Sequence, residues 1–566
     1  MRPRPCAPVL FGVAAALGLV SAGCGEDGCR ADTPGERVAR GEPGREAIVR
    51  ALARAYFPGR VGDIAVIPDP GAIITSPGPD YRYMHGSPWS HDTAVPLLLY
   101  GPGVFEPRTH RGPASHQDIG ATLTTLLGLP PRADVTGHPL RAAFSDAGNE
   151  ADGGQGDARA RPGLVAVLVL DAMRADYLDR YAGLLPNLTR LAAGAARFAE
   201  SRVDYVPTNT STAHTTLSTG TDPAVHGIVG NTLYDRRTGQ ATVAYEGASP
   251  HNLMALAVAD RWGVATRGRA EIVVQGGTDY PAVALAGHGK CILGGHSVWL
   301  AFYDSGSGGW TTNEACFRLP PAARELHFGP RLDAVDRLWL GHELDSYGEA
   351  RRSALFSGFE GEAAVALIEG SAFGEDDVTD LFLANLKGTD YVSHKYGPFS
   401  PEMEATLAEL DRWLGRIVEA LEAKAGPGGL ALVVTADHGM PDTPASDDLW
   451  ATYGDVTAWL NERVDPGGPG VVAFYEGSEN QMYLDPGRLE ALGLEADDIA
   501  RTLEESPVVR FAITEREVRQ ARQVRQARQV RRDAPTSGCG RPRSVARFRR
   551  GDPPTRRRDG NPSGTA

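Results

Sequence analysis

The sequence predicts an α/β fold built around a mostly parallel sheet. Three apolar runs of strand length, at residues 164–170, 381–386 and 430–435, contain almost no polar side chains. Residues at helical spacing lie between such runs, most clearly over 403–421. A parallel sheet is covered by helices on both faces, so its strands are apolar and alternate with helices along the chain.

A compact segment, residues 37–145, precedes these strands and shows elements of its own. The pattern predicts a helix at 48–55, strands at 63–67 and 95–100, and a helix at 119–127. Residues 146–162 are rich in Gly, Asp and Ala and have the composition of a linker. We expect residues 163–518 to form the main domain.

The first 24 residues have the features of an export signal. Two arginines precede an apolar stretch over residues 9–20 that is too short to span a bilayer. Ala22-Gly23-Cys24 resembles a bacterial lipoprotein processing site, and two outcomes stay open: a lipid anchor on Cys24, or simple cleavage. We expect a periplasmic, outer-membrane or secreted protein with a polar leader at 25–36.

The C-terminal residues 519–566 differ in composition from the rest of the chain. The stretch Val-Arg-Gln-Ala-Arg-Gln at 518–523 is repeated at 524–529, and the remainder is rich in Arg, Pro and Gly. Too few apolar residues are present to form a core, which predicts a disordered tail.

Composition limits the functions open to the chain. With 566 residues, 42% of them hydrophobic, it can bury a large core. The formal net charge of −14 provides no basic footprint, so we expect no nucleic-acid partner. Cys291 and Cys316 lie in one segment and either form a disulfide or remain as free buried thiols. The oligomeric state cannot be read from the sequence.

Polar side chains follow each of the three apolar runs. Asp171 follows the first, the pair Asp390 and His394 follows the second, and Asp437-His438 follows the third. Ligands bind at the carboxyl ends of the strands in open α/β sheets. An isolated Asp at such a place is usually a turn or cap residue, but carboxylates and imidazoles from three strands together are donors that suit zinc.

Thr210 is a candidate nucleophile. It lies in a Thr-rich stretch that can begin a helix continuing to Ser218. A hydroxyl at a helix N-terminus is activated by the positive end of the dipole and further by a nearby metal ion. Without metal ligands close by, the same stretch would be an ordinary helix cap.

Residues 207–231 carry a resemblance to a known family. Thr210, His214, Thr219-Gly220, His226-Gly227-Ile228 and Asn231 resemble the alkaline phosphatase superfamily, in its branch of type I phosphodiesterases, nucleotide pyrophosphatases and phosphate-irrepressible bacterial alkaline phosphatases. The resemblance covers residues 163–518 and then 37–145. It implies a three-layer sandwich and an enzyme that hydrolyses small phosphoesters.

The resemblance also implies roles for individual residues. One zinc ion would be held by His85, Asp390 and His394, and a second by Asp171, Asp437 and His438, with Thr210 contacting the second ion. Thr210 would form a phosphothreonine that water then hydrolyses, and Asn231 with the backbone amide beside Thr210 would bind a phosphoryl oxygen.

One departure bears on the substrate. Monoesterases of the bacterial type carry a Lys-x-Arg pair ahead of an Ala-Gly-His segment, and alignment on Ala286-Gly287-His288 places Thr278 and Tyr280 at those positions. Without these cations a dianionic monoester is less well bound, which favours a phosphodiesterase. A phosphomonoesterase remains the alternative, with Arg267, Arg269 or Lys290 as replacement cations, and a non-catalytic remnant is the third possibility.

The order of the motifs indicates a circular permutation. In the family the segment that corresponds to His85-Gly86-Ser87-Pro88 comes last, whereas here it precedes all the other motifs. Joining the old termini through the linker would leave the site intact, because chain ends commonly lie near each other. An error in gene assembly is the alternative explanation of the order.

Overall fold

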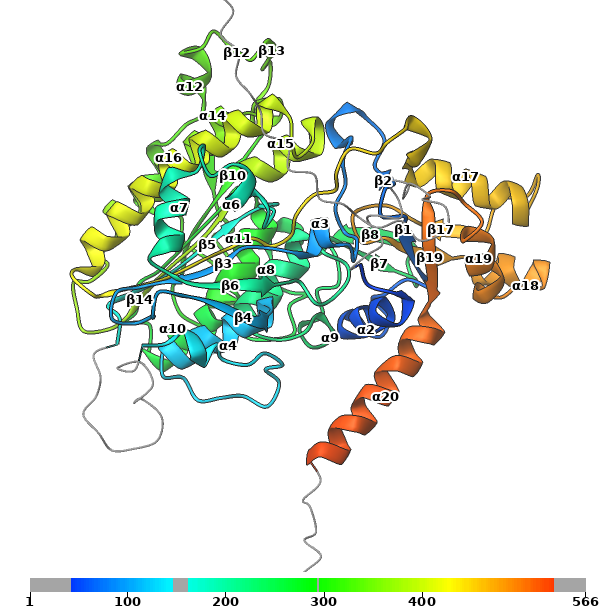
Figure 1. The fold of residues 1–566 in the computed structure, drawn as a ribbon, viewed down its shortest axis with the longest axis horizontal. Coiled ribbons are helices and arrows are strands. Elements are labelled where there is room, and N and C mark those ends of the chain that lie inside the picture. The colour runs from blue at the N-terminus through cyan, green and yellow to red at the C-terminus, as the bar shows by residue number, and fades with distance from the viewer. Residues whose placement is uncertain (1–41, 146–160, 293–294, 534–566) are drawn as a thin grey trace, which may run out of the picture. The chain divides into compact units, whose positions relative to one another are not determined.

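The computed structural model of the protein describes residues 42–145, 161–292 and 295–533, and a nine-stranded sheet lies at its centre (Figure 1). Its order is β11 (Gly309–Thr311), β10 (Trp299–Asp304), β9 (Ile272–Gly276), β14 (Asp380–Leu386), β5 (Leu164–Leu170), β15 (Leu430–Thr435), β3 (Leu97–Tyr100), β6 (Ala196–Ser201) and β4 (Arg108–Ala114). Neighbouring strands from β10 to β15 run parallel, while β11 and β3 are antiparallel to their neighbours. The predicted α/β class with a mostly parallel sheet is confirmed.

Helices cover both faces of this sheet, which makes three layers. In β5, Leu164, Ala166, Leu168 and Leu170 belong to one buried cluster, and Val165, Val167 and Val169 belong to another. The first cluster includes side chains of α7 (Pro186–Ala193), α14 (Ala354–Glu369) and α16 (Pro401–Ala425). The second includes side chains of α4 (His116–Leu126), α8 (Thr210–Thr219), α10 (Val258–Ala265) and α11 (Asp279–Ala286). Because side chains alternate along a strand, β5 packs both helical layers against one sheet.

The described part of the segment 37–145, residues 42–145, is built into the same fold as the rest of the described chain. Its strand β3 pairs with β15 on one side and β6 on the other. Its strand β1 (Ile64–Pro68) lies in a second, antiparallel sheet of order β17 (Val472–Phe474), β18 (Gln481–Leu484), β1 and β19 (Val509–Thr514). The segment therefore contributes β3 and β4 to the nine-stranded sheet and β1 to the second sheet, and the other strands of both sheets come from later in the chain.

The remaining strands form two-stranded ribbons. They are β2 (Ile73–Thr75) with β16 (Trp450–Thr452), β7 (Thr232–Asp235) with β8 (Gln240–Val243), and β12 (Leu338–Trp339) with β13 (His342–Glu343). The remaining α-helices are α2 (Arg45–Ala55), α3 (Ser90–Thr93), α6 (Tyr177–Arg180), α9 (Pro223–His226), α12 (Gly329–Asp333), α13 (Tyr347–Ala350), α15 (Gly388–Tyr396), α17 (Tyr453–Val464), α18 (Pro486–Leu492), α19 (Ala496–Leu503) and α20 (Glu515–Asp533). In the described part of the chain, no helix is long and apolar enough to cross a membrane.

The predicted disorder from residue 519 onward is wrong for residues 519–533, because α20 runs from Glu515 to Asp533. The repeated Val-Arg-Gln-Ala-Arg-Gln stretch consists largely of good helix formers, so it can form a helix although it cannot form a core. The described residues up to Arg522 form one compact unit, and those from Gln523 onward form a second. Residues 534–566 lie outside the described residues, as do the export signal, the leader and positions 146–160 of the linker.

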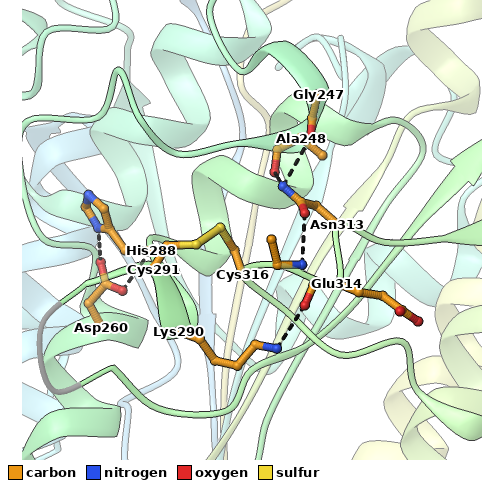
Figure 2. Close-up of a disulfide and its surroundings, with 10 residues drawn as sticks. Gly247, Ala248, Asp260, His288, Lys290, Cys291, Asn313, Glu314 and Cys316 are labelled. Carbon is orange, nitrogen blue, oxygen red and sulfur yellow. Dashed lines mark hydrogen bonds and ion pairs between the residues drawn. A yellow bond between two sulfur atoms is a disulfide. The ribbon is translucent and has the colours of Figure 1, made fainter.

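Cys291 and Cys316 form a disulfide (Figure 2). The backbone amide of Lys290 donates to the carbonyl of Cys316 over 2.9 Å, which ties the same two segments together beside the sulfur atoms. Next to it, His288 Nδ1 lies 2.8 Å from Asp260 Oδ2. Of the two states open to these cysteines, the structure has the bonded one.

Candidate metal and phosphoester site

Three neighbouring parallel strands end at the site. The strand β5 lies between β14 and β15, so their carboxyl ends meet at one edge of the sheet. Asp171 follows β5 directly, Asp437 and His438 follow β15, and α15, which begins after β14, carries Asp390 and His394. The sequence-predicted ligands are brought together here because the strands share a direction.

The backbone after β5 is strained in a way that turns Asp171 inward. Ala172 has φ of 55°, in the left-handed region that non-glycine residues rarely occupy. Its amide donates to Asp437 Oδ1 over 3.1 Å, which stabilises the turn and fixes the second carboxylate. The two strand ends are thus linked directly.

His85, Asp390 and His394 form the first candidate metal group. Asp390 Oδ1 lies 3.2 Å from His394 Nε2 and 3.8 Å from His85 Nε2. The Nδ1 atom of His85 donates to the Thr208 carbonyl over 2.8 Å, and that of His394 donates to the Tyr83 carbonyl over 2.7 Å. These bonds fix the tautomer in which each Nε2 carries a lone pair toward the group.

Asp171, Asp437 and His438 form the second group. His438 Nε2 lies 3.3 Å from Asp437 Oδ2 and 3.6 Å from Asp171 Oδ1, while its Nδ1 donates to the Gly439 carbonyl. The rings of His85 and His438 stack with centroids 3.5 Å apart, so the two groups adjoin.

Burial keeps the imidazoles of His85 and His438 neutral. Burial, together with the neighbouring His438 and His394, holds the pKa of His85 well below its ordinary value. Burial also lowers the pKa of His438. A neutral imidazole is the form that binds a metal ion.

The carboxylates fit cations as well. Asp171 Oδ1, Asp390 Oδ1 and Asp437 Oδ2 are buried and have no hydrogen-bond partner among the described residues. Burial, reinforced by the negative charge of Asp171, raises the pKa of Asp437 well above its ordinary value, so neighbouring carboxylates here disfavour one another's negative charge. Two cations held by these oxygens and the imidazole nitrogens would relieve that repulsion, so the residues fit a two-metal centre.

Thr210 is the first residue of α8 and lies beside the second group. Its Oγ1 is 3.3 Å from His438 Nε2, and the residue is 1% exposed. Asn209 caps the helix by accepting from the Thr212 amide, which leaves Thr210 at the positive end of the helix dipole.

Asn231 lies against the start of the same helix. The backbone amide of Ser211 donates to Asn231 Oδ1 over 2.8 Å, and Asn231 Nδ2 donates to Ser478 Oγ over 3.4 Å. The Asn231 side chain and the Ser211 backbone amide, which we expect to bind a phosphoryl oxygen, are therefore adjacent but hydrogen-bonded to each other in this structure.

The structure adds a site residue that the sequence analysis missed, Lys387. Its Nζ lies 2.9 Å from Asp171 Oδ2, 2.8 Å from Asp390 Oδ2 and 3.2 Å from Thr210 Oγ1. Burial alone would lower the pKa of Lys387, but the two carboxylates raise it well above its ordinary value. The available signal was its position, directly after an apolar strand and three residues before Asp390.

Two further residues hold this arrangement. Glu360 accepts from the backbone amides of Lys387 and Gly388 over 2.7 and 2.9 Å, which caps the start of α15. Asn385 Nδ2 donates to Asp171 Oδ2 over 2.8 Å and lies 3.1 Å from His214 Nε2. Both are fully buried polar residues, but neither belongs to a spacing that marks it in the sequence.

Two of the three replacement cations named from the sequence, Arg269 and Lys290, contact other groups. Arg267, Arg269 and Lys290 are exposed. Arg269 pairs with Asp377, and Lys290 Nζ donates to the Glu314 carbonyl, as Figure 2 shows. Tyr280, by contrast, does reach the site, because its ring centroid is 5.5 Å from Lys387 Nζ.

Comparisons with known proteins agree with this geometry. Residues 165–531 match the family model for type I phosphodiesterase / nucleotide pyrophosphatase. The chain is 27% identical over 422 residues to alkaline phosphatase PafA of Elizabethkingia meningoseptica, covering 63% of this chain and 76% of that protein. It is also 27% identical over 339 residues to alkaline phosphatase PhoV of Synechococcus elongatus, covering 50% of this chain and 60% of PhoV.

A similar relation holds for a fungal protein and for a solved structure. An uncharacterised pyrophosphatase/phosphodiesterase of Schizosaccharomyces pombe is 24% identical over 291 residues, covering 50% of this chain and 46% of its own length. The crystal structure of wild-type PafA superimposes with a TM-score of 0.51 and 25% identity, covering 64% of this chain and 81% of that one.

Proposed function

Since the chain belongs to the type I phosphodiesterase / nucleotide pyrophosphatase family of the alkaline phosphatase superfamily, whose members are phosphoester hydrolases, we propose that it hydrolyses phosphodiesters through Thr210. The observation that carries this proposal is the position of Thr210 Oγ1 beside two adjoining groups of buried metal-ligand side chains. The substrate is a small phosphoester rather than a nucleic acid.

We further propose that the centre takes two zinc ions, one in each group. Nitrogen and carboxylate donors with unpartnered oxygens support this choice. When bound, two such ions supply Lewis acidity at both the attacking and the leaving oxygen of an in-line displacement.

The remaining steps belong to the chain's own residues. Thr210 gives up its hydroxyl proton to solvent, and its Oγ1 bonds to phosphorus as the bond from phosphorus to the leaving oxygen breaks. The leaving oxygen takes up a proton and departs as an alcohol. Water then cleaves the phosphothreonine, which returns the hydroxyl of Thr210 and releases the phosphate product. Asn231 turns its amide from Ser478 toward a non-bridging oxygen as substrate enters, and the Ser211 amide becomes a second donor.

Phosphodiesters are favoured because Thr278 and Tyr280 supply no charge where monoesterases of this type have a cation pair. The second candidate is a phosphomonoesterase. It is supported by the buried ammonium of Lys387 beside Thr210 and by the alkaline phosphatases among the relatives.

The decisive experiment is zinc content measured together with hydrolysis of bis-nitrophenyl phosphate and nitrophenyl phosphate by the full chain. We expect about two zinc ions per chain, as a site of this kind requires, and faster turnover of the diester. Faster turnover of the monoester would replace the first candidate by the second. Metal binding with turnover of neither ester would leave a non-catalytic protein.

Export and circular permutation complete the proposal. The Cys291–Cys316 disulfide supports an oxidising compartment, periplasmic or outside the cell, with Cys24 as the possible lipid anchor. The pairing of β3 with β15 and of β1 with β19 supports a permuted chain whose segment 37–145 is the family's last portion. Cell fractionation of the wild type and a Cys24→Ser variant tests the anchor. If Cys24 carries a lipid, the wild type is found with the membranes and the Cys24→Ser variant is found in the soluble fraction.

A further inference from the structure

Lys387 places an ammonium group inside the metal centre itself. The residue is 1% exposed, and its Nζ contacts Asp171 Oδ2 and Asp390 Oδ2. Asp171 belongs to one metal group and Asp390 to the other. One ammonium therefore connects the two groups.

The ammonium and the imidazoles use different oxygens of the same two carboxylates. Asp390 Oδ1 lies 3.2 Å from His394 Nε2, and Asp171 Oδ1 lies 3.6 Å from His438 Nε2. Neither Oδ1 has a hydrogen-bond partner in the described part of the chain. Lys387 and two metal ions can thus be held at the same time, with Oδ2 serving the lysine and Oδ1 serving the ions.

The lysine has little freedom to leave this position. Glu360 fixes its backbone amide, and a side chain at Gly277 would come within 2.5 Å of the Lys387 Cβ atom. The rings of Tyr280 and Tyr391 each lie 5.5 Å from Nζ, at a distance where an aromatic face attracts a cation. The charge is fixed by packing on several sides.

The same ammonium reaches the nucleophile. Its Nζ is 3.2 Å from Thr210 Oγ1. A phosphoryl group that bonds to this oxygen brings its non-bridging oxygens next to Lys387, where a charge-assisted hydrogen bond can form. The stabilisation from this hydrogen bond grows with the negative charge on the phosphoryl group, so it is greater for a monoester than for a diester.

We propose that Lys387 is a specificity-determining residue that gives this site its activity on phosphate monoesters. It supplies one cation, from the start of α15, in place of the pair that is missing at Thr278 and Tyr280. This inference rests on the proposed chemistry at Thr210. The protein is then a diesterase that also has a lower monoesterase activity, and this second activity depends on one buried lysine.

The test compares Lys387→Met with wild type and with Lys290→Met, which removes an exposed lysine whose Nζ donates only to a backbone carbonyl among its described contacts. In Lys387→Met we expect the ratio of kcat/KM for nitrophenyl phosphate to that for bis-nitrophenyl phosphate to fall about tenfold or more, the effect of losing a hydrogen bond to a charged group. Lys290→Met keeps the wild-type ratio. Equal losses on both esters in Lys387→Met would overturn the proposal.

Binding measurements separate this inference from the proposed function. With zinc content measured on each protein, calorimetry with inorganic phosphate should give a dissociation constant about tenfold or more weaker for zinc-loaded Lys387→Met. The dissociation constant of phosphate can be measured even if wild type hydrolyses neither ester. Unchanged phosphate affinity, or loss of zinc from Lys387→Met, would show that the lysine only positions Asp171 and Asp390.

Discussion

The imidazole rings of His85 and His438 stack at a centroid distance of 3.5 Å and an interplanar angle of 16°. His438 follows the strand β15, whereas His85 comes from the segment that precedes the linker. The two candidate metal groups therefore draw on both parts of the chain.

Replacing His85 should remove one metal ligand without removing the fold. We expect His85→Ala to lose one zinc ion and to lower kcat/KM by about 100-fold or more, as when a group that stabilises the transition state is removed. Metal analysis and ester hydrolysis check this. His138→Ala, an exposed histidine of the same segment, is the control. Full zinc content in His85→Ala would show that the segment does not contribute to the centre.

Replacing Thr210 should stop the chemistry and leave the metal content intact. We expect Thr210→Ala to lose turnover by about 100-fold or more and Thr210→Ser to keep part of it, since a hydroxyl is retained. Acid quenching of wild type during turnover should yield a phosphorylated peptide that contains Thr210. Thr212→Ala is the control, because that hydroxyl has no hydrogen-bond partner in the structure as described. Normal turnover by Thr210→Ala would rule out Thr210 as the nucleophile.

The glycine after His85 should be intolerant of a side chain. Gly86 has φ of 120°, and a Cβ atom there would lie 2.1 Å from the Ser478 carbonyl oxygen. We expect Gly86→Ala to lower the free energy of unfolding by about 2 kcal/mol or more, from overpacking added to backbone strain. Gly59→Ala also has a positive φ but faces open space, so it should cost only about 1 kcal/mol. If urea unfolding gives the same loss in free energy of unfolding for Gly86→Ala and Gly59→Ala, the contact with the Ser478 carbonyl adds no destabilisation.

His226 should make the fold sensitive to acid. Burial, reinforced by the positive charge of Arg60, lowers its pKa from 6.5 to about 3. The ring accepts from the Ile228 amide and lies 3.0 Å from Thr216 Oγ1. Below pH 6.5 the unfolded chain binds a proton that the folded chain does not, so the free energy of unfolding falls as pH falls toward 3. From pH 7.5 to 5 this residue should cost about 2 kcal/mol.

The measurement is urea unfolding of wild type and His226→Asn across that pH range. The asparagine cannot take up the proton, so its stability should decline less steeply below pH 6.5. If the free energy of unfolding falls equally with pH in wild type and in His226→Asn, other groups cause the acid sensitivity.

Much of the fold could be predicted because its strands are strongly apolar. The runs at 164–170 and 430–435 match β5 and β15 residue for residue, and 381–386 misses only Asp380 of β14. Their long, unbroken hydrophobicity decides the assignment. The prediction of disorder is wrong for residues 519–533 because a segment without a core can still form a helix, which needs only local hydrogen bonds.

Five of the six candidate ligands could be located from the sequence because each stands at a strand end or on the following helix, whereas His85 was assigned through the family resemblance. Lys387 had only its position before Asp390 as a signal, and Asn385 and Glu360 had none, since their importance comes from contacts made across the fold. Glu360 lies on α14 and reaches the start of α15 only after both helices pack on the sheet. A lone glutamate has no spacing that reveals such a contact.

The pairing of β1 with β19 has a consequence for biosynthesis. Ile64 is aligned with Thr514, so during synthesis β1 must wait for a strand that follows it much later in the chain before this edge is covered. Contacts of such sequence separation form late, and an uncovered strand edge invites association with other chains. A chain cut short before residue 509 would expose that edge permanently, so premature termination should yield insoluble material rather than a smaller soluble enzyme.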